Sequence, residues 1–316
     1  MGEVSTSYRH TPQVDPEKDR LKARVQAMTT EKDIEKRRKI FTQIANYAEV
    51  AGTDLIGLFH EHSSTEKEKG LENIEIEMKL EDVKLTGTVK TTLETYTFPE
   101  LILPRGHYSQ GKITASSSIN HYFGTPQEER AVYMRHGRGT DLKIKGQNIP
   151  WEGKSIPEKA KYVLRRKETL TTRVGYDLYG SSPLIAIVEE ILAFAQPTPV
   201  TYIGSFTKEK ATTFLLNQET GRIYSVVLGT CNRVDRKEQL ITSGSGKRNQ
   251  LTQIEVEYAG CIPGLTEEKD VELRIIRDIL DIATQLQEYH HLYATTRTKF
   301  EWLQQSREEL KKTTTL

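Results

Sequence analysis

Asn73-Ile74-Glu75-Ile76-Glu77-Met78-Lys79-Leu80 is the stretch of this sequence that decides the fold. Its charged side chains alternate strictly with apolar ones, and successive side chains of a β-strand point to opposite faces. Glu75, Glu77 and Lys79 would therefore share one face of a strand whose other face is apolar. A half-exposed strand with a solvated polar face has the same pattern, so this segment alone does not establish a site.

A second pair of carboxylates with the same spacing occurs late in the chain. In the segment 252–258, Glu255 and Glu257 alternate with apolar neighbours. Four carboxylates gathered on one face repel one another unless a positive charge lies between them. Hard divalent cations prefer oxygen ligands. The two segments together therefore predict a divalent-metal site formed by the four carboxylates of two strands.

Cations alternate in the same way in the segments between the two acidic strands. Each basic pair is commonplace by itself, but a closed sheet with these faces inward would set seven cations, Lys79 included, against the four carboxylates. Such a lumen needs an anionic countercharge, because desolvating many unpaired ions is very costly, and a polyphosphate would provide one. The cations between the two strands are Lys143, Lys145, Arg165, Lys167, Lys208 and Lys210.

Composition limits the class of protein and its partners. The 316 residues carry 45 basic and 44 acidic side chains, and a net charge of +1 gives no global argument for binding nucleic acid or a membrane. Cys231 and Cys261 are the only cysteines, which argues against a disulfide framework or a cysteine zinc site. No apolar run approaches the roughly 18 residues of a membrane span. We expect a cytoplasmic protein with no membrane partner, and its oligomeric state stays open.

The chain divides into three expected parts. An N-terminal helical extension occupies 1–70, with one helix to about Met28 and another from Glu31 to Ala51, and its basic run Lys36–Lys39 is interpreted as a solvated face. A tunnel domain follows at 71–262, and a helical segment at 263–316 ends in a polar tail from 308. Within the tunnel domain we expect further strands near 84–96, 119–124, 131–136, 140–146, 160–168, 200–207, 210–217, 222–231 and 251–259, and a helix at 182–195.

These motifs resemble the CYTH superfamily, the triphosphate tunnel metalloenzymes, which include class IV adenylyl cyclases, thiamine triphosphatases and inorganic triphosphatases. Residues 75–79 match the family's defining ExExK motif. Residues 120–126 match its second-strand signature in part, and residues 255–257 are similar to its late ExE motif. The paired basic residues of the following strands match the cations named above. The resemblance covers about 72–260 and follows the order of motifs in the family.

The resemblance implies an α+β protein built on an eight-stranded antiparallel β-barrel, with helices packed outside and helical N- and C-terminal flanks. It implies catalysis by Glu75, Glu77 and Lys79, with the cations binding phosphate. Mg²⁺ or Mn²⁺ would be held by the carboxylates of both motifs. The family commonly has an aspartate on the strand before the late ExE, whereas this chain has Gly229, which puts metal binding and turnover in question.

Several functions are compatible with these motifs. The leading one is metal-dependent hydrolysis of a triphosphate-containing small molecule, with inorganic tripolyphosphate preferred over ATP because recognition would be nearly all charge. ExExK also occurs in fungal and viral RNA 5′-triphosphatases, so an RNA 5′ end is a second possible partner. A nucleotidyl cyclase and a non-catalytic module that binds polyphosphate or RNA ends are the remaining alternatives.

Overall fold

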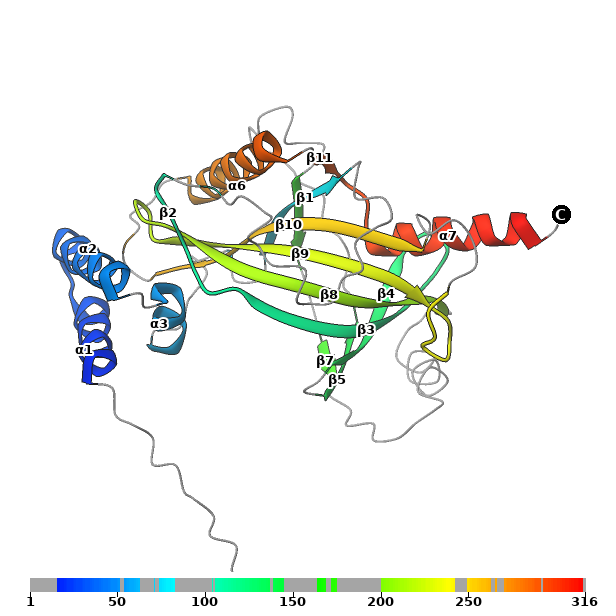
Figure 1. The fold of residues 1–316 in the computed structure, drawn as a ribbon, viewed down its shortest axis with the longest axis horizontal. Helices are drawn as coiled ribbons and strands as arrows, with labels where there is room; N and C mark the ends of the chain where they lie inside the picture. Colours follow the sequence, from blue (N-terminus) through cyan, green and yellow to red (C-terminus); the bar gives the residue numbers. More distant parts are fainter. Residues whose placement is uncertain are drawn as a thin grey trace, which may run out of the picture.

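The computed structural model describes the greater part of the chain as an antiparallel sheet with helices at both ends and on one face (Figure 1). No helix among the described residues is long and apolar enough to cross a membrane. The described residues are 16–51, 54–62, 71, 74–82, 104, 106–136, 139–144, 164–168, 172–174, 200–241, 249–262, 265, 270–290 and 292–314.

Three helices precede the sheet. They are α1 (Pro16–Thr30), α2 (Ile34–Ala51) and α3 (Leu55–His62). The first two confirm the predicted N-terminal helices, whereas the third was not predicted. Their apolar faces pack together, with Phe41 and Phe59 in ring contact, so the three helices form a small bundle.

The sheet contains eleven described strands, and every pairing between them is antiparallel. The main path runs β11-β1-β10-β9-β8-β3-β4-β5-β7, while β2 pairs with β8 and β6 pairs with β1. The strands are β1 (Ile74–Asp82), β2 (Tyr108–Gln110), β3 (Thr114–Gly124), β4 (Glu129–His136), β5 (Gly139–Ile144), β6 (Leu164–Glu168), β7 (Thr172–Val174), β8 (Thr201–Asn217), β9 (Arg222–Val234), β10 (Gln250–Cys261) and β11 (Leu292–Thr295).

Alternation on β1 and β10 separates two faces of the sheet. Residues directly opposite each other on paired strands lie on the same face. Lys79 is opposite Glu255, and Met78 is opposite Val256. We call the face with the charged residues the charged face and the other the α6 face.

The α6 face holds the largest apolar core. Helix α6 (Val271–Tyr289) lies against β1 and β10, and its side chains Ile275, Ile279, Ile282 and Leu286 are buried there. Ile279 has no exposed surface, and Ile76, Leu80 and Val256 of the sheet are likewise buried in this core. An isoleucine buried in this way contributes about 1.5–3 kcal/mol of burial free energy. This core holds the two acidic strands side by side.

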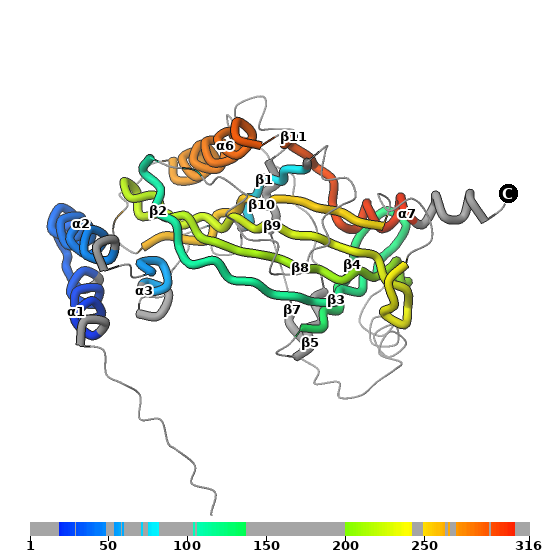
Figure 2. The backbone as a smooth tube through the Cα atoms, viewed as in Figure 1, coloured from blue at the N-terminus to red at the C-terminus, as the bar shows by residue number. Residues whose placement is uncertain are grey.

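The charged face is covered by helices at its two ends (Figure 2). At one end, helix α7 (Lys299–Thr314) packs Trp302 against Phe206, whose position on β8 is two residues before Lys208 and therefore on the charged face. At the other end, the α1–α3 bundle packs against Leu216 and Ile223. The central part of this face lies between the two apolar contacts.

Strands β6 and β7 connect the two ends of the sheet path. β6 pairs with β1 near one end, and β7 pairs with β5 at the other. Glu168 and Thr172 are four residue steps apart, so the chain between them spans at most about 14 Å. The two ends of the path therefore approach each other, although no ladder among the described residues joins β6 to β7.

The structure corrects several predicted elements. The two strands expected at 200–207 and 210–217 are one continuous strand, β8. The predicted polar tail continues as helix α7 to Thr314, and the C-terminal segment also supplies a strand, β11, that pairs with β1. Helices were expected on the outside of the barrel, but helix α7 packs on the charged face. The strand predicted at 84–96 and the helix predicted at 182–195 lie outside the described residues.

Candidate functional site

The two acidic motifs lie on neighbouring strands, and their charged residues share one face of the sheet. β1 and β10 pair antiparallel, with Glu77 opposite Glu257 and Lys79 opposite Glu255. Glu77 is 3% exposed and Lys79 is 6% exposed, so a strand face made of charged residues is almost entirely buried. Buried ions are stable only when they are paired. The ion pairs among these side chains therefore define the site.

Five charged side chains form what we call the charged cluster. The Lys79 ammonium lies 3.2 Å from Glu77 Oε1 and 3.6 Å from Glu255 Oε1. The Lys208 ammonium lies 3.7 Å from Glu255 Oε2. Lys299, at the start of α7, forms a direct hydrogen-bonded ion pair with Glu255 Oε1. The cluster thus contains two carboxylates and three ammonium groups.

Burial and mutual charge shift the pKa values in this cluster. Burial acts to raise the pKa of the Glu255 carboxyl, but Lys299, Lys208 and Lys79 outweigh it and hold that pKa well below its usual range. Burial acts to lower the pKa of Lys299, and Glu255 reverses this and raises it. The pKa of Lys208 is lowered by burial and then by the nearby Lys299. Glu255 is therefore ionised, and it stabilises the charged form of its lysine neighbours.

The start of α7 holds Lys299 in place. Thr298 and Glu301 form a reciprocal capping box, in which the Glu301 amide donates to Thr298 Oγ1 at 3.0 Å and the Thr298 amide donates to Glu301 Oε2 at 2.7 Å. Gln253 of β10 donates to the Arg297 carbonyl at 3.0 Å. Sequence reasoning missed Lys299, although the Thr-x-x-Glu pattern marked a helix start at this point.

The remaining predicted cations are distributed unevenly. Lys210 lies on the charged face, opposite Gly229, and is exposed. In the backbone register, Arg165 and Lys167 of β6 are opposite Glu77 and Glu75, and Lys143 of β5 is opposite Val132. Lys145 lies outside the described residues. The register thus places β6 beside the acidic strand.

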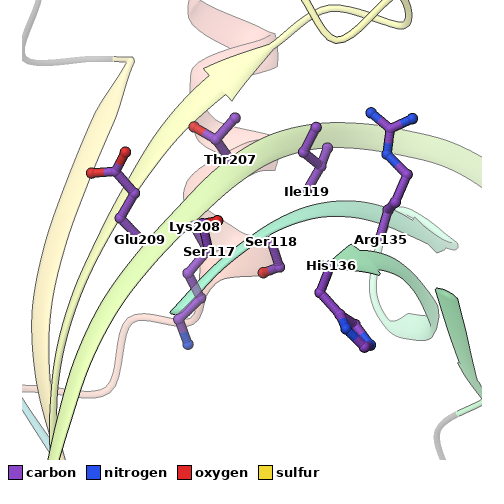
Figure 3. A pocket seen from close by; sticks show the side chains of 8 residues that line it. All are labelled: Ser117, Ser118, Ile119, Arg135, His136, Thr207, Lys208 and Glu209. Atoms are coloured by element: carbon purple, nitrogen blue, oxygen red, sulfur yellow. The ribbon is translucent and has the colours of Figure 1, made fainter. Parts of the chain in front are cut away.

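A cavity of about 410 Å³ lies beside Lys208, among β3, β4 and β8. In Figure 3, Lys208, Ser118 and His136 extend to one side of the sheet, whereas Ile119 and Arg135 extend to the other. Ser118 is opposite both Lys208 and His136 in the register. A hydroxyl and an imidazole therefore continue the polar surface of the charged face beyond the cluster.

His121 and Gly229 lie on opposite faces of the sheet. His121 lies on the face opposite the cluster, where its Nδ1 is 2.5 Å from Ser205 Oγ and its Nε2 is 3.3 Å from Glu238. Burial lowers the pKa of His121, although Glu238 acts to raise it. Gly229 faces the cluster, since a Cβ built there would lie 3.5 Å from Lys208 Cε. This position thus has room for a side chain but offers no carboxylate.

No family model and no curated protein sequence matches this chain. Among solved structures, a conserved hypothetical protein from Pyrococcus furiosus is similar at 14% identity and a TM-score of 0.32, covering 72% of this chain and 99% of that one.

Two further solved structures are similar at the same level. A chain of the Schizosaccharomyces pombe Mediator head module matches at 7% identity and a TM-score of 0.36, covering 70% of this chain and 100% of that one. The S. pombe RNA triphosphatase Pct1 matches at 12% identity and a TM-score of 0.28, covering 92% and 98%. Structural similarity this low says nothing about function, so function is inferred from the site itself.

The surroundings of Glu255 do not fit a divalent metal. The described residues contain no group of three or more His, Cys, Asp or Glu side chains suited to holding one. Both oxygens of Glu255 are engaged by ammonium groups. A dication about 4 Å from an ammonium would be repelled by on the order of 8 kcal/mol at an effective dielectric constant near 20. The metal site predicted from the four carboxylates stays a prediction, against which the pairing of Glu255 argues.

Proposed function

We propose that the charged face binds the triphosphate part of a small-molecule substrate and that the protein is a triphosphatase. The observation that carries the proposal is the convergence of Lys79, Lys208 and Lys299, from three separate elements, on one buried carboxylate. Charge-assisted hydrogen bonds from ammonium groups to phosphate oxygens are strong, especially where water is partly excluded. The sequence resemblance to triphosphate tunnel enzymes supports the same assignment.

The chemistry requires mainly positioning and charge stabilisation. Phosphoryl transfer proceeds through a state whose charge is spread over the phosphate oxygens, so fixed cations lower its energy without forming covalent bonds. Lys79 and Lys208 would hold the oxygens, and Glu77 and Glu255 would keep the two ammonium groups oriented. Lys210 extends the cationic surface along β8 toward a second phosphate.

We infer that the sheet closes into a tunnel around this surface. The short connection between β6 and β7 supports closure, because it links strands that pair at the two ends of the sheet path. A closed wall would surround the substrate with the cations of β5 and β6, including Lys143, Arg165 and Lys167. It would also exclude water, which strengthens each ionic contact.

We further propose inorganic tripolyphosphate as the preferred substrate. Three described aromatic side chains near the cluster, Tyr122, Phe206 and Trp302, are buried against one another under α7 and are not exposed for stacking on a base. Tyr293 of β11 is exposed, but its hydroxyl is engaged by Glu81. Recognition by charge favours the substrate with the most charge per unit length.

Phosphate release tests this function directly. We would compare kcat/KM for tripolyphosphate, ATP, thiamine triphosphate and a short 5′-triphosphate RNA, each in Mg²⁺, in Mn²⁺ and in EDTA. We expect tripolyphosphate to be hydrolysed most efficiently. Hydrolysis of RNA or a nucleotide with equal efficiency would contradict the charge-only argument, and product analysis with ATP would reveal a cyclase.

A non-catalytic module that binds polyphosphate or RNA ends is the second candidate. It is favoured by Gly229, which stands where the resemblance expects an aspartate, and by the ammonium groups that occupy Glu255. Calorimetric binding of tripolyphosphate without phosphate release under any metal condition would support this second function over the first.

A further inference from the structure

The proposal concerns the cation that the Glu255 carboxylate holds. We propose that Lys299 of α7 occupies, on Glu255, the place that the family pattern assigns to a divalent metal ion, so that Glu255 positions lysines instead of binding metal. The inference rests on the proposed function only for the identity of the anion that the lysines bind. It makes Lys299 a built-in counter-cation whose removal would open a metal site.

The first step is the occupancy of Glu255. Lys79 and Lys299 both reach Oε1, and Lys208 reaches Oε2. A carboxylate that binds a metal must direct at least one oxygen at it, and a bound dication would lie within a few ångström of these ammonium groups. Metal and lysine therefore compete for the same oxygens.

The second step is that Lys299 is held at this position. Its side chain is only 12% exposed. The residues that follow it, Phe300, Trp302 and Leu303, are buried in the apolar contact between α7 and the charged face. The capping box of Thr298 fixes the first turn of the helix. The backbone on both sides of Lys299 is therefore anchored, which holds the base of its side chain beside Glu255.

The third step is the charge that remains without Lys299. Without Lys299, the ion pairs described for Glu255 are those with Lys79 and Lys208, and Glu77 on the same face is paired with Lys79. One positive charge has then left Glu255 and the volume of a lysine head beside it is vacated, so a divalent cation can approach its oxygens. Replacing Lys299 by an uncharged side chain of similar length should therefore create metal affinity.

The experiment measures Mn²⁺ binding to the substrate-free protein by electron paramagnetic resonance. The variants are Lys299→Met, Lys299→Arg, Glu255→Gln and the double variant Lys299→Met/Glu255→Gln, with Lys210→Met as the matched control that removes an exposed cation of the same face. We expect no retained Mn²⁺ in the wild type, in Lys299→Arg or in Lys210→Met. Lys299→Met should gain affinity at least about tenfold, since an ammonium that repels the dication has been removed. The double variant should lose that gain.

Two results would overturn the proposal. One is Mn²⁺ binding by the wild type that Glu255→Gln abolishes, which would make Glu255 a resident metal ligand. The other is a folded Lys299→Met variant, checked by circular dichroism, that gains no Mn²⁺ affinity. If Lys299→Met does not fold, the comparison of wild type with Glu255→Gln decides the question. All these measurements are made without substrate, so an absence of triphosphatase activity would count against the proposed function alone.

Discussion

The two faces formed by β1 and β10 differ in the side chains that they bury, apolar on one and charged on the other. On the α6 face, Ile76 and Val256 join a core of buried apolar side chains. On the charged face, Lys79 is 6% exposed and the Glu255 side chain is 16% exposed, and both require partners. The α6 face gains free energy from burial, whereas the charged face has to offset the cost of desolvating ions. Stability should therefore depend on one face and anion binding on the other.

The largest expected effect tests the α6 face. Ile279→Ala should lower the free energy of unfolding by about 2–5 kcal/mol, because the fully buried side chain would leave a cavity between α6 and the sheet. Urea denaturation would measure the change, and Ile279→Val is the matched control with an expected loss of about 0.5–1.5 kcal/mol. Tripolyphosphate affinity of the folded variant should not change. A loss below that of the valine control would show that α6 is not the main support of the sheet.

The second prediction concerns the charged face, where we expect a loss of binding affinity with little loss of stability. Lys208→Met should weaken tripolyphosphate binding about 10–100-fold, as expected for the loss of a hydrogen bond to a charged group. The free energy of unfolding should change little, because Glu255 keeps Lys79 and Lys299 as partners and the repulsion between Lys208 and Lys299 disappears. Calorimetry and urea denaturation separate the two quantities. Large destabilisation with unchanged affinity would make Lys208 a structural residue.

The third prediction tests whether water reaches the charged face. Cys231 lies opposite Lys208 on this face and is 1% exposed. Burial raises its pKa to about 11, although Lys299 and Lys208 act to lower it. At pH 8 the folded protein should therefore resist iodoacetamide, while the denatured chain reacts at Cys231 and Cys261, as mass spectrometry would record. Rapid alkylation of Cys231 in the folded protein would mean that water enters the face freely.

The raised pKa of Cys231 also predicts the direction in which stability changes with pH. The unfolded thiol loses its proton above its usual pKa of 9.0, whereas the folded thiol keeps its proton until about pH 11. In that window the unfolded state binds fewer protons, so Cys231 contributes a loss of stability as the pH rises. Replacement by alanine should flatten this part of the pH profile.

Much of this contrast could be read from the sequence, because alternation directly encodes the two faces of a strand. That Glu75, Glu77 and Lys79 share one face of their strand, as do Glu255 and Glu257 of theirs, follows from period two alone. The difference between Lys208 and Lys210 could not be predicted, since both have the same spacing. Lys208 reaches Glu255 and is nearly buried, whereas Lys210 is exposed.

Lys299 shows a different limit of sequence reasoning. It follows Thr298 in a polar segment with no alternation, so its chemistry comes from where α7 packs and not from a local pattern. The aromatic residues that bury the start of α7 lie on distant strands, including Phe206 of β8. A contact between segments nearly a hundred residues apart leaves no periodic signal in either.

The smallest expected effect concerns Gly229, the position where the resemblance expects an aspartate. Its Cβ would meet Lys208 Cε at 3.5 Å and the Gln253 carbonyl at 3.9 Å, which are ordinary contacts. Gly229→Ala should therefore raise the free energy of unfolding by about 0.5–1 kcal/mol, because glycine in a strand loses more backbone entropy on folding. Gly229→Asp should add a carboxylate beside Lys208 and reduce tripolyphosphate affinity in EDTA, with the alanine variant as its steric control. If both variants destabilise the protein, the space beside Lys208 is filled, and glycine is present for steric reasons rather than as a lost ligand.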